Sequence, residues 1–295
     1  MYSAGQGGGQ VVSRDTLFRE CVSLMDKNGI DSSYFDTLCI FQDILCDKNP
    51  LFRPLENVPD DKREFILNLV ERRTEGYPLQ YLLGQWEFYG YTFRVNENVL
   101  IPRPDTETLI ENILEIYRKN NLKSPKIVDL CSGSGCIAVT LKKQIPDAEV
   151  YAVEISEKAV EVISENAELN NVDIHIINSD ALNPETVEML PETDIIVCNP
   201  PYLTQYDMDN LQKEVTFEPS LALFGGDDGL DFYRKITSLW RKSLKNNGWI
   251  AYEFGDGQHD DVGKILGKNN FYNITFSRDT QNIIRTVTAQ KQEDM

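Results

Sequence analysis

Short apolar runs alternate with helical stretches along the last two thirds of the chain, and this alternation limits the possible folds more than any other feature. The helical stretches cover residues 137–145, 157–170 and 230–246. The apolar runs are Lys126–Leu130, Val150–Ile155, Ile174–Asn178, Asp194–Cys198, Trp249–Phe254, Tyr272–Ser277 and Ile283–Ala289. Strands that alternate with helices form βαβ units, which predict a parallel sheet. Because only a short connection separates the last two runs, we expect them to form an antiparallel hairpin at the sheet edge.

The first third of the chain has a different, helical pattern. Apolar residues recur at helical spacing from about Arg14 to Glu75, which predicts a small helical domain over residues 13–84. Residues 85–99 carry aromatic and β-branched side chains around a central glycine and are predicted to form a β-hairpin linker. A second domain is expected over residues 100–295, and the glycine-rich residues 1–12 are interpreted as a flexible lead.

A loop of small residues, Cys131-Ser-Gly-Ser-Gly135, connects the first predicted strand to the next helix. Such a loop turns its backbone N–H groups toward the crevice at the carboxyl end of the strand, where open α/β sheets bind ligands. Gly133, Gly135 and Ala138 fit the G-x-G-x-x-A pattern of adenosine-containing cofactors. The pattern alone does not separate NAD, FAD and other cofactors of this kind.

Acidic residues end the next two predicted strands. Glu154 lies 19 residues after Gly135, a spacing at which a carboxylate meets ribose hydroxyls. Asp180, followed by the small Ala181, is suited to hydrogen-bond an adenine edge. Each acid could instead cap the helix that follows it. Two acids at successive strand ends beside one glycine loop favour a nucleoside site.

The tetrapeptide Asn199-Pro-Pro-Tyr202 directly follows the fourth predicted strand. Two consecutive prolines stiffen a loop and keep the preceding residue extended, which fixes the Asn199 side chain. The Asn199 oxygen and the Pro200 carbonyl can each accept one hydrogen of a planar NH₂ group, while Tyr202 packs on its flat face. A turn without a function would explain Pro200 and Pro201, but not Asn199 and Tyr202. These four residues are therefore the candidate substrate-binding residues.

Together these motifs resemble class I S-adenosylmethionine-dependent methyltransferases that act on an exocyclic or amide nitrogen. A narrower resemblance, over residues 14–290, is to the HemK/PrmC family, which methylates the glutamine of the Gly-Gly-Gln motif in peptide-chain release factors. Its further motifs here are Gly76–Gly84, Glu87-Phe88, Leu100–Glu107, Glu218–Leu223, Gly225–Arg234 and Glu253–Gly255 with Gln258. One departure is Cys131, which stands where the family often has the first glycine of its loop, so its backbone must adopt whatever dihedral angles that loop requires.

The resemblance implies a Rossmann-like domain with a seven-stranded, mostly parallel sheet, preceded by a helical domain for substrate recognition. It implies S-adenosylmethionine as the cofactor and the N5 nitrogen of glutamine as the methyl acceptor. The residues that it assigns to the cofactor are Cys131, Ser132, Gly133, Ser134, Gly135, Glu154, Asp180, Ala181 and Asn199, with Arg103 and Thr106 nearby. A helix-capping role is the alternative for Thr106. Catalysis is assigned to Asn199 and Pro200, which would orient the glutamine amide without a general base.

Charge and composition restrict the partners. The net charge is −18, of which −13 falls on residues 101–295, and no basic stripe is present, so direct binding of nucleic acid is not expected. The six cysteines contain no C-x-x-C pair and indicate reduced thiols, and with only two histidines no metal site is expected. No apolar stretch is long enough to span a membrane and no signal sequence is evident, which predicts no membrane partner and a cytoplasmic location.

Other functions stay open at this point. The same core could methylate a ribosomal-protein glutamine or adenine N6 of nucleic acid, although the acidic charge disfavours nucleic acid. The glycine loop also fits a nicotinamide-dependent oxidoreductase, and a binding module without catalysis is a third possibility. The leading hypothesis is methylation of a release-factor glutamine.

Overall fold

The computed structural model describes residues 12–293. The flexible lead expected over residues 1–12 therefore lies, except for its last residue, outside the described part. The chain divides into two compact units. One contains the residues up to Leu83 together with Lys213–Phe217, and the other contains Gly84–Gln212 and the residues from Glu218 onward.

The first unit is helical, as the apolar spacing predicts. Its helices are α1 (Arg14–Lys27), α2 (Ser33–Leu45), α3 (Asp60–Thr74) and the short α4 (Leu79–Leu83), with a 3₁₀ turn at Pro50–Phe52. The Ser13 side chain caps α1 by accepting a hydrogen bond from the Thr16 N–H. The Arg73 guanidinium joins the buried Asp36 carboxylate to Glu214, each at 2.6 Å. This ion pair attaches the segment Lys213–Phe217 to the helices.

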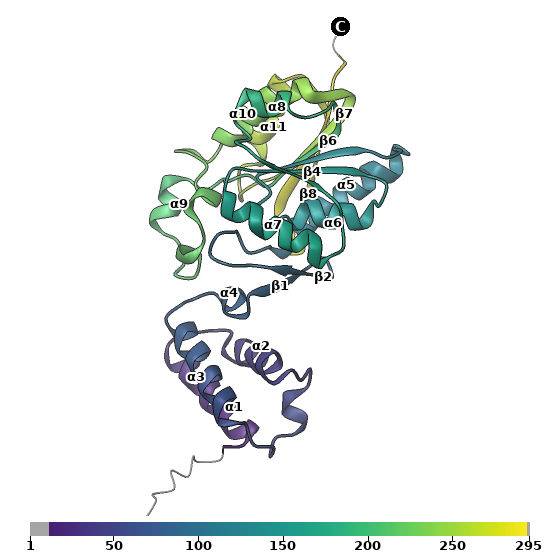
Figure 1. Ribbon diagram of the computed structural model, residues 1–295. Helices are drawn as coiled ribbons and strands as arrows, with labels where there is room; N and C mark the ends of the chain where they lie inside the picture. Colours follow the sequence, from purple (N-terminus) through teal and green to yellow (C-terminus); the bar gives the residue numbers. More distant parts are fainter. Residues whose placement is uncertain (1–11, 294–295) are drawn as a thin grey trace, which may run out of the picture. The chain divides into compact units, whose positions relative to one another are not determined.

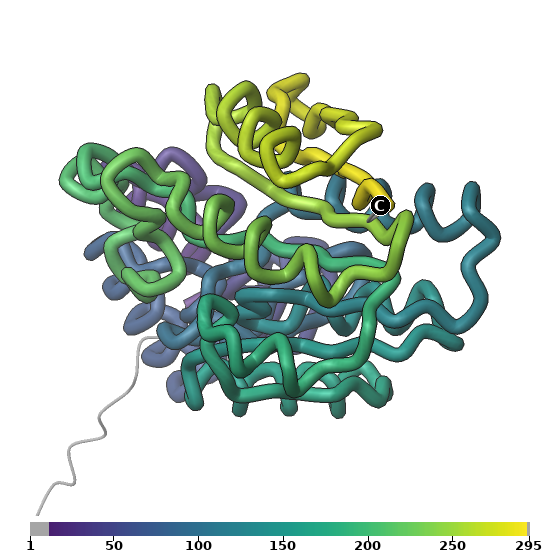
Figure 2. The backbone as a smooth tube through the Cα atoms, turned by 90° about the horizontal axis from the view of Figure 1, so that it is seen from above, coloured from purple at the N-terminus to yellow at the C-terminus, as the bar shows by residue number. Residues whose placement is uncertain are grey.

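The second unit is built on a seven-stranded sheet in the order β5-β4-β3-β6-β7-β9-β8. Its strands are β3 (Lys126–Leu130), β4 (Glu149–Glu154), β5 (His175–Asn178), β6 (Thr193–Cys198), β7 (Leu244–Glu253), β8 (Phe271–Arg278) and β9 (Ile284–Lys291). The first five pair in parallel, and β8 and β9 form an antiparallel hairpin that joins the sheet through β7. In Figure 2 the teal segments of this unit lie on one side and its yellow C-terminal segments on the other. The predicted fold class is confirmed.

Helices cover both faces of this sheet (Figure 1). One face carries α5 (Glu107–Lys119), α6 (Cys136–Gln144) and α7 (Glu157–Leu169), and the other carries α8 (Pro184–Glu188), α10 (Asp231–Trp240) and α11 (His259–Lys268). A further short helix, α9 (Gln205–Asp209), follows β6. Each face has its own apolar core, because strands buried on both sides need two covering layers. Within residues 12–293, no helix combines the length and the apolar character that crossing a membrane requires.

The helix predicted over residues 230–246 is shorter in the structure and ends at Trp240. Helix α10 stops at Trp240, a 3₁₀ turn covers Arg241–Ser243, and Leu244 already begins β7. Leu244 is fully buried and pairs with Thr193 of β6. Pairing within the sheet therefore overrides the helical pattern of this stretch, which extends β7 five residues ahead of the predicted strand start.

The segment predicted as a hairpin linker forms the antiparallel strands β1 (Gln85–Phe88) and β2 (Tyr91–Arg94), which belong to the second unit. Asn166 of α7 attaches it to the sheet domain. The fully buried Asn166 amide donates hydrogen bonds to the carbonyls of Arg94 and Ser134 and accepts one from the Arg94 N–H. One side chain thereby connects the hairpin, α7 and the glycine loop.

We expect Asn166→Ala to lower the free energy of unfolding by about 3 kcal/mol, because several buried backbone groups would lose their partner. Urea denaturation measures the change. The control is Glu165→Ala, which changes an exposed neighbour on the same helix and should stay within about 0.5 kcal/mol of the parent. Equal stability of the two variants would contradict this role of Asn166.

Candidate active site

A buried carboxyl group holds the start of the glycine loop. Asp129 of β3 is 0% exposed, and its Oδ2 accepts a hydrogen bond from the Ala138 N–H in the first turn of α6 at 3.2 Å. Burial raises the pKa of Asp129 to about 8, against the opposing hydrogen bonds from Ser132 and Ala138. The carboxyl group thus ties β3 to α6, and the loop between them is fixed at both ends.

The loop needs left-handed backbone at three positions. Cys131, Gly133 and Gly135 have φ of 58°, 55° and 76°. A Cβ on Gly135 would lie 3.0 Å from Ile163 Cγ2, so glycine lets α7 pack closely there, whereas the space around Gly133 is open. Cys131 adopts a conformation that costs an ordinary residue about 1–2 kcal/mol. The loop therefore requires Cys131, which replaces the glycine of the family, to adopt a positive φ.

Glu154, at the end of β4, is held by two backbone donors. The Gly133 N–H donates to Oε2 and the Ser156 N–H donates to Oε1, each at 2.9 Å. The alternative capping role is wrong, because the Ser156 side chain caps α7. Each carboxylate oxygen keeps a further lone pair, so the group can accept hydroxyl hydrogens while it stays in place. This donor-bound carboxylate fits the hydroxyls of a ribose.

Asp180 and Ala181 follow β5 and are fixed by their own turn. The Asp180 Oδ1 accepts from the Leu182 N–H at 2.8 Å, and the Ala181 carbonyl accepts from the indole N–H of the buried Trp240 at 2.7 Å. Asn183, not Asp180, caps α8, so capping does not explain this acid either. The turn is therefore rigid and presents a carboxylate beside a small side chain.

The Asn199-Pro-Pro-Tyr202 loop leaves the sheet at the carboxyl end of β6. Pro200 and Pro201 are buried, and Asn199 is half-buried. The Asn199 Nδ2 donates to the Thr106 Oγ1 at 3.4 Å. Burial raises the pKa of the Tyr202 phenol above its usual range, so this side chain is neutral. The loop offers an oriented amide and a neutral aromatic ring, as the sequence motif requires.

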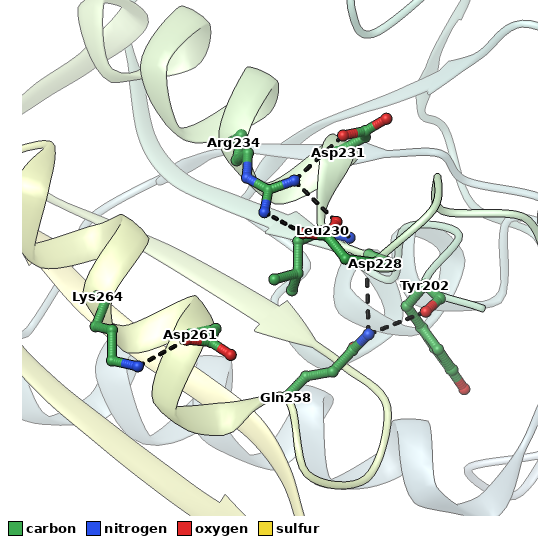
Figure 3. Close-up of polar contacts among 9 residues, drawn as sticks. Tyr202, Asp228, Leu230, Asp231, Arg234, Gln258, Asp261 and Lys264 are labelled. Carbon is green, nitrogen blue, oxygen red and sulfur yellow. Dashed lines mark hydrogen bonds and ion pairs between the residues drawn. The ribbon is translucent and has the colours of Figure 1, made fainter. Parts of the chain in front are cut away.

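Gln258 connects this loop to the turn at Gly229 and to its own turn at Gly255; Figure 3 draws the bonds of its amide nitrogen. Its Nε2 donates to the carbonyls of Tyr202 at 3.0 Å and Gly229 at 3.5 Å, and its Oε1 accepts from the Gly255 N–H at 2.9 Å. A Cβ on Gly229 would lie 2.3 Å from the Tyr202 carbonyl oxygen, so the backbones approach too closely for any other residue. An ion pair of Asp228 with Arg234 fixes the same turn.

These segments surround a cavity of about 260 Å³. Seven of the predicted site residues line it: Cys131, Gly133, Glu154, Asp180, Ala181, Asn199 and Pro201. Five more lining residues lie in family motifs named from the sequence but were given no role there: Leu100, Pro219, Leu221, Ala222 and Phe232. The lining residues outside those motifs are Asn98, Val99, Val153, Ile155, Ser156, Ala159, Ser179 and Leu182. Among residues 12–293, no three His, Cys, Asp or Glu side chains gather as a metal site requires.

The other predicted residues lie outside the cavity lining. Ser132, Ser134, Gly135, Pro200 and Tyr202 belong to the loops that shape it. Arg103 pairs with the buried carboxylate of Glu218, whose other oxygen accepts from the Ile101 N–H at 3.2 Å. Thr106 precedes α5, but its side chain makes no capping hydrogen bond, so the capping alternative is wrong.

The two units match two protein families. Residues 16–84 match the PrmC N-terminal domain and residues 104–219 match the methyltransferase small domain. The release factor glutamine methyltransferase of Fusobacterium nucleatum is 37% identical over 93% of this chain and 78% of its own length. The enzyme of the same name from Clostridium acetobutylicum is 35% identical over 94% of this chain and 97% of its own.

Solved structures share the fold at lower identity. The hMettl16 catalytic domain, in complex with MAT2A 3′UTR hairpin 6, has a TM-score of 0.54 at 15% identity, over 80% of this chain and 84% of that one. The T. thermophilus 16S rRNA N2 G1207 methyltransferase, in complex with AdoMet and guanosine, has a TM-score of 0.50 at 17% identity, over 70% of this chain and 50% of that one.

The sheet order, the glycine loop and the acids at the strand ends define a Rossmann-like methyltransferase. Within this class, the chain belongs to the release factor glutamine methyltransferase family, which it matches in both units and over nearly its full length.

We expect Cys131→Val to lower the free energy of unfolding and Cys131→Gly to leave it nearly unchanged. Glycine adopts positive φ freely, so Cys131→Gly should stay within about 1 kcal/mol of the parent, whereas a β-branched residue should lose about 2 kcal/mol. Urea denaturation measures the free energy of unfolding. Equal stability of the two variants would show that the loop backbone relaxes away from the left-handed conformation.

Proposed function

We propose that the protein transfers a methyl group from S-adenosylmethionine to the side-chain amide nitrogen, N5, of the glutamine in the Gly-Gly-Gln motif of peptide-chain release factors. Membership of the release factor glutamine methyltransferase family supports the reaction and the substrate class. The observation that carries the proposal for this site is the oriented Asn199 amide at a nucleoside-sized cavity lined by Glu154 and Asp180.

The cavity residues fit S-adenosylmethionine. Glu154 would accept the ribose hydroxyls, Asp180 and Ala181 would meet the adenine edge, and the loop Cys131–Gly135 would lie along the adenosine. The open space at Gly133 leaves room for a close approach of the ligand to the backbone. When bound, the cofactor supplies an electrophilic methyl group on a sulfonium.

Asn199 and Pro200 would position the acceptor amide. The Asn199 Nδ2 is turned toward Thr106, so its Oδ1 can accept one hydrogen of the substrate NH₂, and the Pro200 carbonyl can accept the other. Two acceptors hold the nitrogen in line with the methyl group and draw electron density onto it, and Pro201 and Tyr202 would line its flat face. The nitrogen becomes acidic only once methylated, so its proton leaves after the transfer without a general base.

The helical unit would serve substrate recognition. The site needs a protein segment that enters it, and the methyltransferase domain carries most of the excess negative charge, which disfavours a nucleic acid as the direct partner. We extend the proposal to a cytoplasmic enzyme without a membrane partner, because translation factors act there.

The test is methylation of purified substrates. We expect labelled methyl groups to appear in a release factor, and mass spectrometry to place one methyl on the glutamine of its Gly-Gly-Gln motif. A release factor with alanine in place of that glutamine is the negative control. Label that appears only in a ribosomal protein would contradict the proposal and indicate methylation of a glutamine there. Label that appears only in DNA would contradict it and indicate methylation of adenine N6. Binding of NADH without binding of S-adenosylmethionine, measured by calorimetry, would indicate an oxidoreductase.

We expect Asn199→Ala to lower kcat by about 100-fold, because the acceptor amide loses an oriented hydrogen-bond acceptor. The Kd of S-adenosylmethionine should change little, since the cofactor keeps its contacts with the loop and the acids. Asn210→Ala removes an exposed asparagine amide of α9's C-cap and is the matched control. Full activity of Asn199→Ala would remove Asn199 from its assigned role.

A further inference from the structure

A buried carboxyl group lies beside the Asn199 amide, and the mechanism above gives it no task. Glu253 ends β7 and Asn199 follows β6, and the register of these parallel strands pairs Cys198 with Tyr252. The next residue on each strand is therefore Asn199 or Glu253, side by side. Glu253 is 2% exposed, and its Oε2 has no hydrogen-bond partner among the described residues.

Thr106 completes the cluster. Its side chain is 2% exposed and its hydroxyl accepts the hydrogen bond from the Asn199 Nδ2. The Glu253 carboxyl group is close enough to this hydroxyl and amide for both to lower its pKa by hydrogen bonding, against the effect of burial. The Thr106 hydroxyl, which accepts from Asn199, keeps its own hydrogen free to donate to the neighbouring carboxylate and so can act as a relay between the two.

The order of donors and acceptors decides which way the Asn199 amide points. The two ends of an asparagine amide have nearly the same size, so packing alone does not prevent a rotation that exchanges oxygen and nitrogen. In the rotated form an NH₂ group would face the NH₂ of the substrate, and neither could accept. An ionised carboxylate can only accept hydrogen bonds. It therefore favours the orientation in which the Asn199 nitrogen points toward it and the Asn199 oxygen points toward the substrate.

We propose that Glu253, together with Thr106, is a positioning residue that fixes the orientation of the Asn199 amide so that its Oδ1 accepts the hydrogen of the substrate nitrogen. The proposal rests on the function assigned above, because it concerns the same acceptor site. Neither residue lines the cofactor cavity, so Thr106, which the resemblance places near the cofactor, takes a positioning role instead.

The protonation state of Glu253 makes this orientation depend on pH. Burial raises the pKa of Glu253 to about 7, with hydrogen bonds from Thr106 and Asn199 acting in the opposite direction. Above that pH the carboxylate accepts only, whereas below it the carboxylic acid can donate to Oδ1 and allow the rotated amide. The other charged and titratable groups that act on Glu253 or feel its charge are Asp105, Arg285, Tyr202, Tyr233 and Cys136.

The first experiment compares Glu253→Gln with the parent. Glutamine keeps the shape but can present either end to Asn199, so we expect kcat to fall roughly tenfold while the Kd of S-adenosylmethionine stays within about twofold. The parent should lose activity as the pH falls through about 7, and this limb should be absent in Glu253→Gln. Glu161→Gln, on the exposed face of α7, is the matched control. The proposal is overturned if Glu253→Gln has the kcat of the parent and loses activity at low pH as the parent does. It is also overturned if the variant loses as much affinity for S-adenosylmethionine as it loses kcat.

The second experiment needs no substrate and so separates this proposal from the assigned function. The side-chain NH₂ resonances of Asn199, identified by their loss in Asn199→Ala, should shift with pH around 7 in the parent but not in Glu253→Gln. Resonances that do not respond in the parent overturn the proposal even if release factors are methylated. Thr106→Val, which removes the relay hydroxyl, should lower kcat similarly and Thr106→Ser should restore it, and a fully active Thr106→Val also overturns it.

Discussion

Parallel pairing of β4, β3, β6 and β7 is the constraint on which the site depends. Because the strands run in the same direction, their carboxyl ends meet at one edge of the sheet, and each delivers one group there. The glycine loop follows β3, Glu154 ends β4, Asn199 follows β6 and Glu253 ends β7. A one-residue change of register would turn each of these side chains toward the opposite face of the sheet. The two apolar cores that cover the sheet therefore hold the chemistry in place, and only a few of their residues, such as Ala181 and Val153, also line the cavity.

The sequence predicts most of this edge because local motifs specify it. A strand, a loop of small residues and a helix form a short continuous unit, and Glu154 and the Asn199-Pro-Pro-Tyr loop each follow a recognisable apolar run. The opposite wall of the cavity was not predictable in the same way. Leu221, Ala222 and Phe232 belong to two of the family motifs, but a motif far along the chain gives no position in space, and only the packed fold brings these residues to the glycine loop.

Long-range packing also accounts for the differences in the fold. Leu244 looks helical by its spacing, but pairing with β6 makes it a strand residue. Lys213–Phe217 lie within the methyltransferase part of the sequence, yet they cluster with the helical unit because Arg73 pairs with Glu214 across a separation of 141 residues. No local pattern around Glu214 distinguishes it from the many other acidic residues. Ion pairs between distant segments leave no periodic signal in the sequence. The clustering of Lys213–Phe217 with the helical unit was therefore not predictable.

The proposed chemistry explains why an acceptor is useful on each side of the Asn199 amide. An amide nitrogen is a weak nucleophile because its lone pair is delocalised into the carbonyl group, so the enzyme gains most from holding the NH₂ group rigidly in one direction. A donor placed against that NH₂ would repel it, whereas the Pro200 carbonyl and the Asn199 oxygen, in their proposed roles, would attract it. Keeping the oxygen in place requires an acceptor behind the amide nitrogen, and a buried carboxylate meets this need better than a hydroxyl alone. The cost of burying such a charge, visible in the raised pKa of Glu253, is therefore consistent with a role in orienting the reacting group.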